Sequence, residues 1–149
     1  MLNRITLPAL ALATLTTGCI VYESDYRDVP DRRAPPAAIN YAPEILDADA
    51  GCYFDRAYRD DIWMFDAIVD DPNGPLDVVA VWADVYDEWD GTLVESFELF
   101  PTDDPYYWFS DWLGSTTWLA CGYDLYSVDI VAYDTLDAVD AITIIPWWE

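Results

Sequence analysis

Short apolar runs separated by turn residues constrain the fold of this chain more than any other feature. Between residues 41 and 149, runs of β-branched and aromatic residues recur between clusters of Asp, Pro, Asn and Gly. In the run "DIWMFDAIVDD", residues 61–71, alternate positions are apolar: Trp63, Phe65, Ala67 and Val69. Alternation with a period of two is typical of a β-strand that buries one face.

The same pattern predicts seven strands and no convincing α-helix. After the turn "DDPNGP", the chain resumes as a strand with one apolar row: Val79, Val81, Ala83 and Val85. The expected strands lie near 42–46 and at 61–71, 78–86, 93–100, 106–112, 125–134 and 141–145. Short strands with turn signals about every 10 to 20 residues predict an all-β fold, an antiparallel β-sandwich.

Composition narrows the possible functions. The chain has 29 Asp and Glu against six Arg, with no Lys and no His, and a formal net charge of -23. Such a surface does not neutralise phosphate groups, so nucleic acid is excluded as a partner and cations fit better. Without His, the Ser-His-Asp and Cys-His arrangements and histidine-based zinc sites are ruled out. A hydrophobic share of 54% nevertheless predicts a folded protein.

The N-terminus, "MLNRITLPALALATLTTGC", has the layout of a secretory signal peptide: a positive charge, an apolar stretch, and small residues before a cysteine. Its end resembles the cleavage motif of bacterial lipoproteins, in which a small residue precedes the cysteine that is lipidated. Thr17, Gly18 and Cys19 match this motif, whereas Thr16 stands where Leu is commonest. The resemblance implies that residues 1–18 are removed and that Cys19 is acylated.

Two alternatives remain for this segment, namely an ordinary signal peptide with an unrelated cysteine or a single membrane span. The apolar stretch 5–17 has about 13 residues, short of the roughly 20 that cross a bilayer. Residues 19–40 combine Pro, Ala and mixed charges without apolar periodicity, so we expect a tether there and the folded domain at 41–149.

The expected location follows from this layout. It is the bacterial cell envelope outside the cytoplasm, at the outer membrane, where the lipid anchor contacts the membrane. An envelope protein or a polysaccharide is the expected partner.

The stretch "LYSVDIVAYD", residues 125–134, gives the fold a closer resemblance. Tyr126, Val128, Ile130 and Ala132 resemble the tyrosine-corner strand of immunoglobulin-like and fibronectin type III-like domains. The stretch "VDDPNGPLDVVAV" is similar to a turn of bacterial surface domains in this superfamily. The resemblance implies an immunoglobulin-like sandwich in which the Tyr hydroxyl bonds to upstream backbone. Such folds carry no fixed function.

Two cysteines remain once Cys19 is assigned to the lipid. Cys52 and Cys121 form an even pair in an exported domain, which indicates a disulfide. Two buried thiols are the alternative. Neither arrangement suggests redox chemistry.

Acidic residues crowd one turn in a pattern that suits calcium. Asp70, Asp71, Asn73 and Asp77 offer carboxylate and amide oxygens, which calcium prefers as ligands. The turn lacks the later bidentate Glu and the full alternation of an EF-hand loop. We therefore expect a solvated turn in which Asp70 or Asp71 caps local backbone amides, with a calcium site as the alternative. No other cofactor is expected.

An aromatic cluster offers a second kind of site. The stretch "PYYWFSDW", residues 105–112, contains Tyr107, Trp108 and Trp112, which could stack against a sugar beside acidic groups. An aromatic-rich core would have the same composition, because alternate residues of a sandwich strand face inward. Exposed, coplanar rings would distinguish the sugar platform.

These features predict a non-catalytic interaction or structural module of the cell envelope, with a carbohydrate-binding module as the alternative. An enzyme is not expected, because acidic pairs suited to glycoside hydrolysis arise by chance among 29 acids. The acidity has a further explanation. Residues 41–149 hold 25 of the acids, since only Glu23, Asp25, Asp28 and Asp31 precede them, and salt or bound cations relieve such self-repulsion. A saline habitat therefore explains the charge as well as a ligand does.

Overall fold

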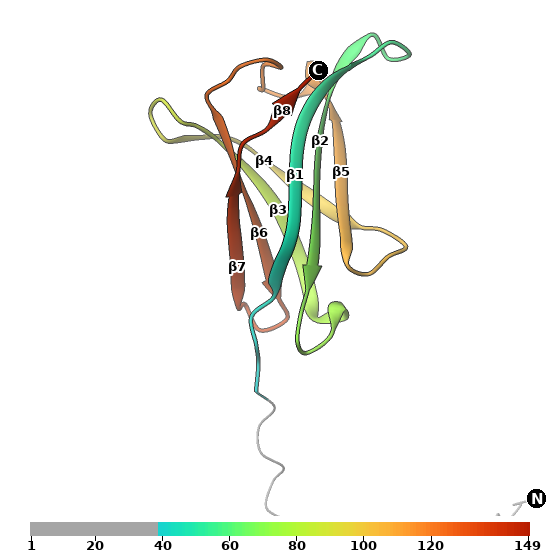
Figure 1. Cartoon of the computed structure of the whole chain (residues 1–149), viewed down its shortest axis with the longest axis vertical. Coiled ribbons are helices and arrows are strands. Elements are labelled where there is room, and N and C mark those ends of the chain that lie inside the picture. Colours follow the sequence, from blue (N-terminus) through green and yellow to red (C-terminus); the bar gives the residue numbers. More distant parts are fainter. Residues whose placement is uncertain (1–38) are drawn as a thin grey trace, which may run out of the picture. The chain divides into compact units, whose positions relative to one another are not determined.

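The computed structural model describes residues 39–149, and these residues form one β-rich body (Figure 1). The predicted signal peptide at 1–18, the predicted lipidation site Cys19 and nearly all of the predicted tether at 19–40 lie outside the described residues. Within the described range there is no helix long and apolar enough to cross a membrane.

Eight β-strands and two short 3-10 helices make up this body. The strands are β1 (Glu44–Asp55), β2 (Asp60–Asp70), β3 (Val78–Asp87), β4 (Thr92–Pro101), β5 (Tyr107–Leu113), β6 (Tyr126–Asp134), β7 (Val139–Ile144) and β8 (Trp147–Trp148). The 3-10 helices are η1 (Pro75–Asp77) and η2 (Gly114–Thr116).

The strands form one curled sheet in the order β7-β6-β3-β4-β5-β2-β1-β8. Only two residue pairs, Phe100 with Phe109 and Pro101 with Trp108, join β4 to β5, so the sheet divides into two halves there. The halves β7-β6-β3-β4 and β5-β2-β1-β8 face each other as the layers of a sandwich that stays joined at one side, like half of a barrel (Figure 1). The predicted all-β fold class is confirmed, and the curled sheet is compatible with the predicted sandwich, with eight strands instead of seven. The immunoglobulin-like resemblance stays a prediction. Neighbouring strands are antiparallel except for β1 and β8.

The core lies between the two halves and follows the alternation seen in the sequence. The predicted inward residues of β2 are all fully buried: Trp63, Phe65, Ala67 and Val69. Rows from β3 and β6 meet them from the opposite half: Val81, Ala83, Val85, Val128, Ile130 and Ala132. The ring centroids of Trp63 and Tyr126 lie 6.0 Å apart, and those of Phe65 and Phe97 lie 4.8 Å apart. Removal of this apolar surface from water is the main contribution that holds the two halves together.

One predicted row is wrong at its first position. Val79 is expected to face inward, but it is 52% exposed, and Val78 is buried in its place. A register shift between Val78 and Ala80 in the pairing with β6 is the cause. Such a bulge adds one residue to the strand and turns the preceding side chain to the opposite face.

Tyr126 makes the contact that the tyrosine-corner resemblance implies. Its hydroxyl accepts a hydrogen bond from the N–H of Ala120, six residues upstream, at 3.2 Å. Its ring is buried and packs edge-on against Tyr123, with 4.7 Å between the centroids. The hydroxyl therefore ties the loop before β6 to the core.

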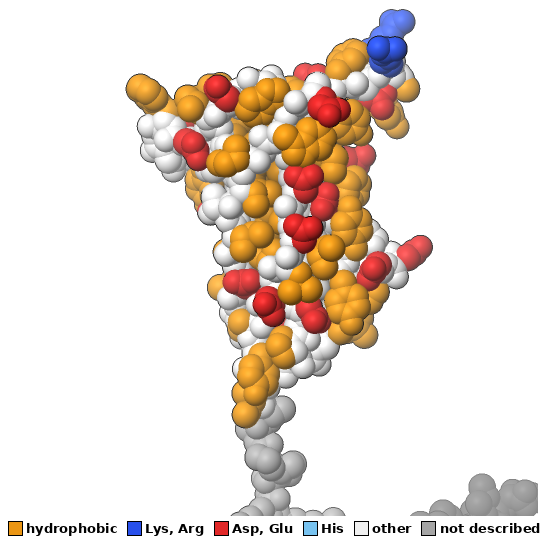
Figure 2. Space-filling view, viewed as in Figure 1, with side chains coloured by type: hydrophobic (Ala, Val, Ile, Leu, Met, Phe, Trp, Pro, Cys, Tyr) orange, Lys and Arg blue, Asp and Glu red, His pale blue; other side chains and the backbone are white. Residues whose placement is uncertain are grey.

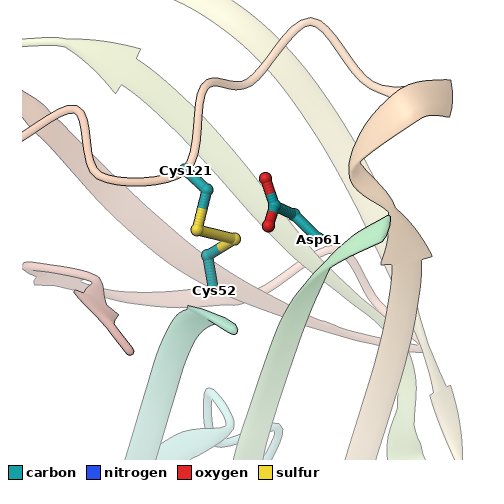
Figure 3. Close-up of side chains that lie close together, drawn as sticks. All are labelled: Cys52, Asp61 and Cys121. Atoms are coloured by element: carbon teal, nitrogen blue, oxygen red, sulfur yellow. A yellow bond between two sulfur atoms is a disulfide. The ribbon is translucent and has the colours of Figure 1, made fainter. Parts of the chain in front are cut away.

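Cys52 and Cys121 form the predicted disulfide, with their Cα atoms 5.7 Å apart. Cys52 is fully buried in β1, and Cys121 lies in the loop that leads to β6, so the bond links the two halves of the sandwich. Asp61 lies beside the bond (Figure 3). Because both sulfur atoms are used in the disulfide, these three residues do not form a metal site.

Pairing with neighbouring strands, and not local sequence, determines where β1 and β8 form. The sequence predicts a strand near 42–46, whereas β1 continues to Asp55 in register with β2. The stretch "DADAG" has low β-propensity, so its pairing with β2 outweighs its intrinsic preference. The two residues of β8 pair with Gly51 and Cys52. A Cβ atom at Gly51 would lie 2.3 Å from the ring of Trp147, so only glycine allows this indole to lie on the sheet.

Candidate functional site

Three carboxylates meet at the end of the domain where residue 39 enters, drawn at the bottom of Figure 1. Asp71, Asp77 and Asp134 are termed the acidic cluster. Each offers one carboxylate oxygen, and these oxygens lie within 4.8 Å of one another. Asp71 follows β2, Asp77 ends η1 and Asp134 ends β6, so the cluster is built by the β2–β3 and β6–β7 turns.

The cluster is largely buried and far from the basic side chains of residues 39–149. Asp71 and Asp134 are 2% and 1% exposed, while Asp77 is half-buried. The two arginines of the described residues, Arg56 and Arg59, lie in the β1–β2 turn at the opposite end of β2. At about 3.3 Å per residue, the 11 residues of β2 place that turn roughly 35 Å from Asp71. Neither arginine can therefore neutralise the cluster.

Hydrogen bonds keep the carboxylate of Asp134 in its charged form. Oδ1 accepts from the N–H of Leu136 at 2.8 Å and of Ala138 at 2.7 Å, and Oδ2 accepts from the side-chain amide of Asn40 at 2.5 Å. Burial raises the pKa of Asp134, but these hydrogen bonds outweigh burial and hold the pKa below its usual range.

Asp71 is the member whose hydrogen bonding is incomplete. Its Oδ1 accepts from the N–H of Asn73 at 2.7 Å. Its other carboxylate oxygen, Oδ2, is buried and has no hydrogen-bond partner in the part of the chain that the structure describes. In Asp77, by contrast, Oδ1 accepts from the hydroxyl of Thr135. A buried oxygen without a partner costs free energy unless something binds it.

The first described residues are bonded to the same end of the domain. Oδ1 of Asn73 accepts from the N–H of Tyr41 at 2.8 Å, and Nδ2 of Asn73 donates to the carbonyl of Ile39 at 2.9 Å. Asn40 bonds to Asp134, so residues 39–41 contact both turns that build the cluster. These hydrogen bonds therefore hold the first described residues, 39–41, against the two turns that carry the acidic cluster.

The structure brings together two of the four residues considered for calcium, Asp71 and Asp77. Asp70 lies outside the cluster and accepts from the N–H of Asp71 at 2.8 Å, and both side-chain polar atoms of Asn73 are used on residues 39 and 41. The predicted capping by Asp70 and Asp71 is confirmed. The predicted solvated position of Asp71 is wrong, because the turn folds its carboxylate into the domain.

The sequence does not reveal that Asp134 belongs to this group. The pairing of β3 with β6 sets Val78 opposite Asp134 and so carries Asp134 to the β2–β3 turn. The sequence shows only that Asp134 stands at the end of a predicted strand, and many other acids of this chain also stand at strand ends.

A second arrangement covers the outer face of β1, β2 and β5. Asp49, Asp66, Tyr107, Phe109 and Trp147 are termed the acidic-aromatic face. Asp66 lies opposite Asp49 on one neighbouring strand and opposite Phe109 on the other. The rings of Tyr107 and Phe109 are nearly parallel, with centroids 6.5 Å apart. Nε1 of Trp147 donates to both carboxylate oxygens of Asp49, at 3.0 and 2.9 Å. Figure 2 shows acidic side chains in a row between hydrophobic ones.

The charges on this face act on one another. Burial raises the pKa of Asp66 above its usual value, and the carboxylates of Asp49 and Asp47 raise it further. Burial, followed by the charges of Asp66 and Asp49, also raises the pKa of Tyr107. A bound positive charge would relieve this repulsion, so the face favours cationic groups.

The three aromatic residues considered for sugar binding do not share one surface. Tyr107 lies on the acidic-aromatic face, whereas Trp108 points into the core and is only 6% exposed. Trp112 is 39% exposed and packs against Phe97 of β4, with 5.6 Å between the ring centroids. Because successive residues of β5 face opposite sides, Trp108 is withdrawn from any surface ligand.

Trp112 lines a small hollow of its own. The hollow has a volume of about 190 Å³ and is formed by Tyr58, Ile62, Asp111, Trp112 and Leu113. It combines aromatic rings, which can stack against a sugar, with a carboxylate that can accept hydrogen bonds from hydroxyl groups.

Directly opposed acids recur in both halves of the sandwich. Four cross-strand pairs of the described residues are acid against acid: Glu44 with Asp70, Asp49 with Asp66, Asp55 with Asp60, and Asp84 with Asp129. Like charges directly opposite each other are destabilising, by a few tenths to about 1 kcal/mol. The pair Asp84 and Asp129 is the counterpart, on the other half, of the pair in the acidic-aromatic face.

Comparisons with known proteins found no relative for the chain: no protein family, no curated protein and no solved structure matches it. Its function is therefore inferred from its own residues and contacts.

Proposed function

We propose that this protein is a lipid-anchored, non-catalytic module of the bacterial cell envelope that binds a partner through the acidic-aromatic face. The observation that carries the proposal is the opposed pair Asp49 and Asp66, bordered by aromatic rings on one outer face. Carboxylates attract cationic groups over a distance, and aromatic faces bind them at contact. A basic segment of an envelope protein is the partner of this chemistry.

Two further features support an envelope location. The disulfide between Cys52 and Cys121 suits an exported domain, because such bonds persist in oxidising compartments. The "LTTGC" motif supports lipid attachment at Cys19, and the segment between Cys19 and the folded domain would act as the tether.

The hollow beside Trp112 favours a second candidate function, carbohydrate binding. There an aromatic ring, the exposed ring of Tyr58 and the carboxylate of Asp111 converge on one small space. An envelope polysaccharide would present hydroxyl groups to Asp111 and a ring face to Trp112.

Site-specific photo-crosslinking in the native envelope tests the first candidate. A benzoylphenylalanine at Phe109 should give a crosslinked partner, whereas one at Val131, on the outer face of the other half, should not. Asp49→Asn with Asp66→Asn should abolish this product, and the matched pair Asp84→Asn with Asp129→Asn should leave it unchanged, because both double changes remove two opposed charges. Equal products from Phe109 and Val131, or equal loss in the two double variants, would contradict the proposal.

The same variants separate the second candidate. If the partner is a polysaccharide bound in the hollow, Trp112→Ala should abolish retention on the purified polysaccharide, and the Asp49 and Asp66 changes should not. Retention that survives Trp112→Ala and Asp111→Asn would exclude sugar binding at this position.

A further inference from the structure

The acidic cluster concentrates negative charge in a place where residues 39–149 supply no balancing charge. Asp71 and Asp134 are almost fully buried, and the two arginines of the described residues lie roughly 35 Å away along β2. Burying ionised carboxylates side by side is costly unless a positive charge or a proton is present. The hydrogen bonds to Asp134 offset the burial of its own charge, so the carboxylate left without compensation is that of Asp71.

One carboxylate oxygen of the cluster is buried without a hydrogen-bond partner among the described residues. Both oxygens of Asp134 and Oδ1 of Asp77 accept hydrogen bonds from Asn40 and from the β6–β7 turn, which a purely structural role would explain. Oδ2 of Asp71 has none, although it is buried. A cation would satisfy such a buried acceptor, and the two neighbouring carboxylates favour a positive ligand over a neutral one.

We propose that Asp71, Asp77 and Asp134 bind one calcium ion. Calcium takes oxygen ligands at 2.3–2.6 Å, so two oxygens on opposite sides of the ion are about 5 Å apart at most. The separations within the cluster, up to 4.8 Å, meet this limit. Half-buried Asp77 forms the solvent side, through which the ion enters and where water completes its shell.

The site joins three segments that are distant in sequence. The ion would cross-link the β2–β3 turn to the β6–β7 turn, and the bond from Asn40 to Asp134 would extend this link to the start of the domain. Calcium bound there stabilises the folded state and fixes residues 39–41 on the domain, because they contact the same two turns. This role does not depend on which partner the acidic-aromatic face binds.

Calorimetric titration of the chelator-treated full chain with CaCl2, at constant ionic strength, tests the proposal. We expect saturable binding of one ion per chain. At a calcium concentration a hundred times the Kd, Tm should rise by about 10 °C. Asp71→Asn and Asp77→Asn should each weaken binding at least tenfold. Asp70→Asn is the matched control, because it removes an adjacent charge outside the cluster, and it should change the Kd less than twofold.

Several results would overturn the proposal. One is a Tm that rises with calcium no more than with NaCl at the same ionic strength, without saturable heat. A second is equal weakening by Asp70→Asn and Asp71→Asn, which would make the effect one of general charge. Tighter binding of magnesium than of calcium would overturn the choice of ion. If Asp71→Asn fails to fold, Asp77→Asn decides the outcome, because Asp77 is half-buried and its loss leaves the core intact.

Discussion

Removing the disulfide should destabilise this domain more than any other change outside the core. The bond joins residues separated by 69 positions, so without it the unfolded chain regains the entropy of a long loop. In the chain-entropy model a loop of that length corresponds to about 4 kcal/mol at 25 °C. For a body of about 110 residues the entropy of unfolding is about 0.23 kcal/mol/K, so Tm should fall by roughly 15 to 20 °C.

Denaturant unfolding of three forms measures this loss and separates its causes. The oxidised protein, the protein reduced with dithiothreitol, and the variant Cys52→Ala with Cys121→Ala should be compared at one temperature. The reduced form keeps both sulfur atoms, so any further loss in the alanine variant reports mainly the space left by Cys52, which is fully buried. A loss below about 1 kcal/mol on reduction would refute the loop-closure reasoning.

Three other changes test contacts of the fold. Tyr126→Phe removes the hydroxyl that accepts from Ala120, and it should lower the free energy of unfolding by about 1 kcal/mol in urea titrations; an unchanged stability would mean that the tyrosine contact is not formed. Asp66→Asn should stabilise the domain at pH 7. Burial, followed by the charges of Asp49 and Asp47, raises the pKa of Asp66 in the folded state. The gain in stability from Asp66→Asn should therefore shrink as the pH falls through this raised pKa towards the ordinary value of 3.8. A gain that grows as the pH falls would contradict this reasoning. Asp84→Asn should add about 0.5 kcal/mol at low ionic strength by removing the repulsion from Asp129, and thermal melts in 1 M NaCl should show no difference.

The strands that bury one face were predictable because their side chains alternate. Trp63, Phe65 and the residues that follow them in β2 are buried as the period of two requires. The exceptions arise where local sequence does not decide. Val79 faces outward because of a bulge in the pairing with β6, and β1 extends through a segment of low β-propensity because β2 provides a partner.

Only two of the three members of the acidic cluster could be predicted to lie close together, for a related reason. Asp71 and Asp77 are close in sequence and flank the "PNG" turn, so their proximity could be predicted. Asp134 joins them through the register of β3 with β6, and no local pattern separates it from the other acids that end strands. The aromatic stretch at 105–112 had the opposite ambiguity. Its rings divide between the core, which holds Trp108, and the surface, which holds Tyr107, as the pleat of β5 dictates.

The central claim is that this acidic sandwich is exported and held in the cell envelope by lipid at Cys19. Intact-protein mass spectrometry of the chain extracted from membranes, without reductant, tests it most directly. The expected mass is that of residues 19–149 with an acylated N-terminal cysteine and two hydrogens fewer for the disulfide of Cys52 and Cys121. A chain that retains residues 1–18, or that begins elsewhere without a lipid, would contradict the claim.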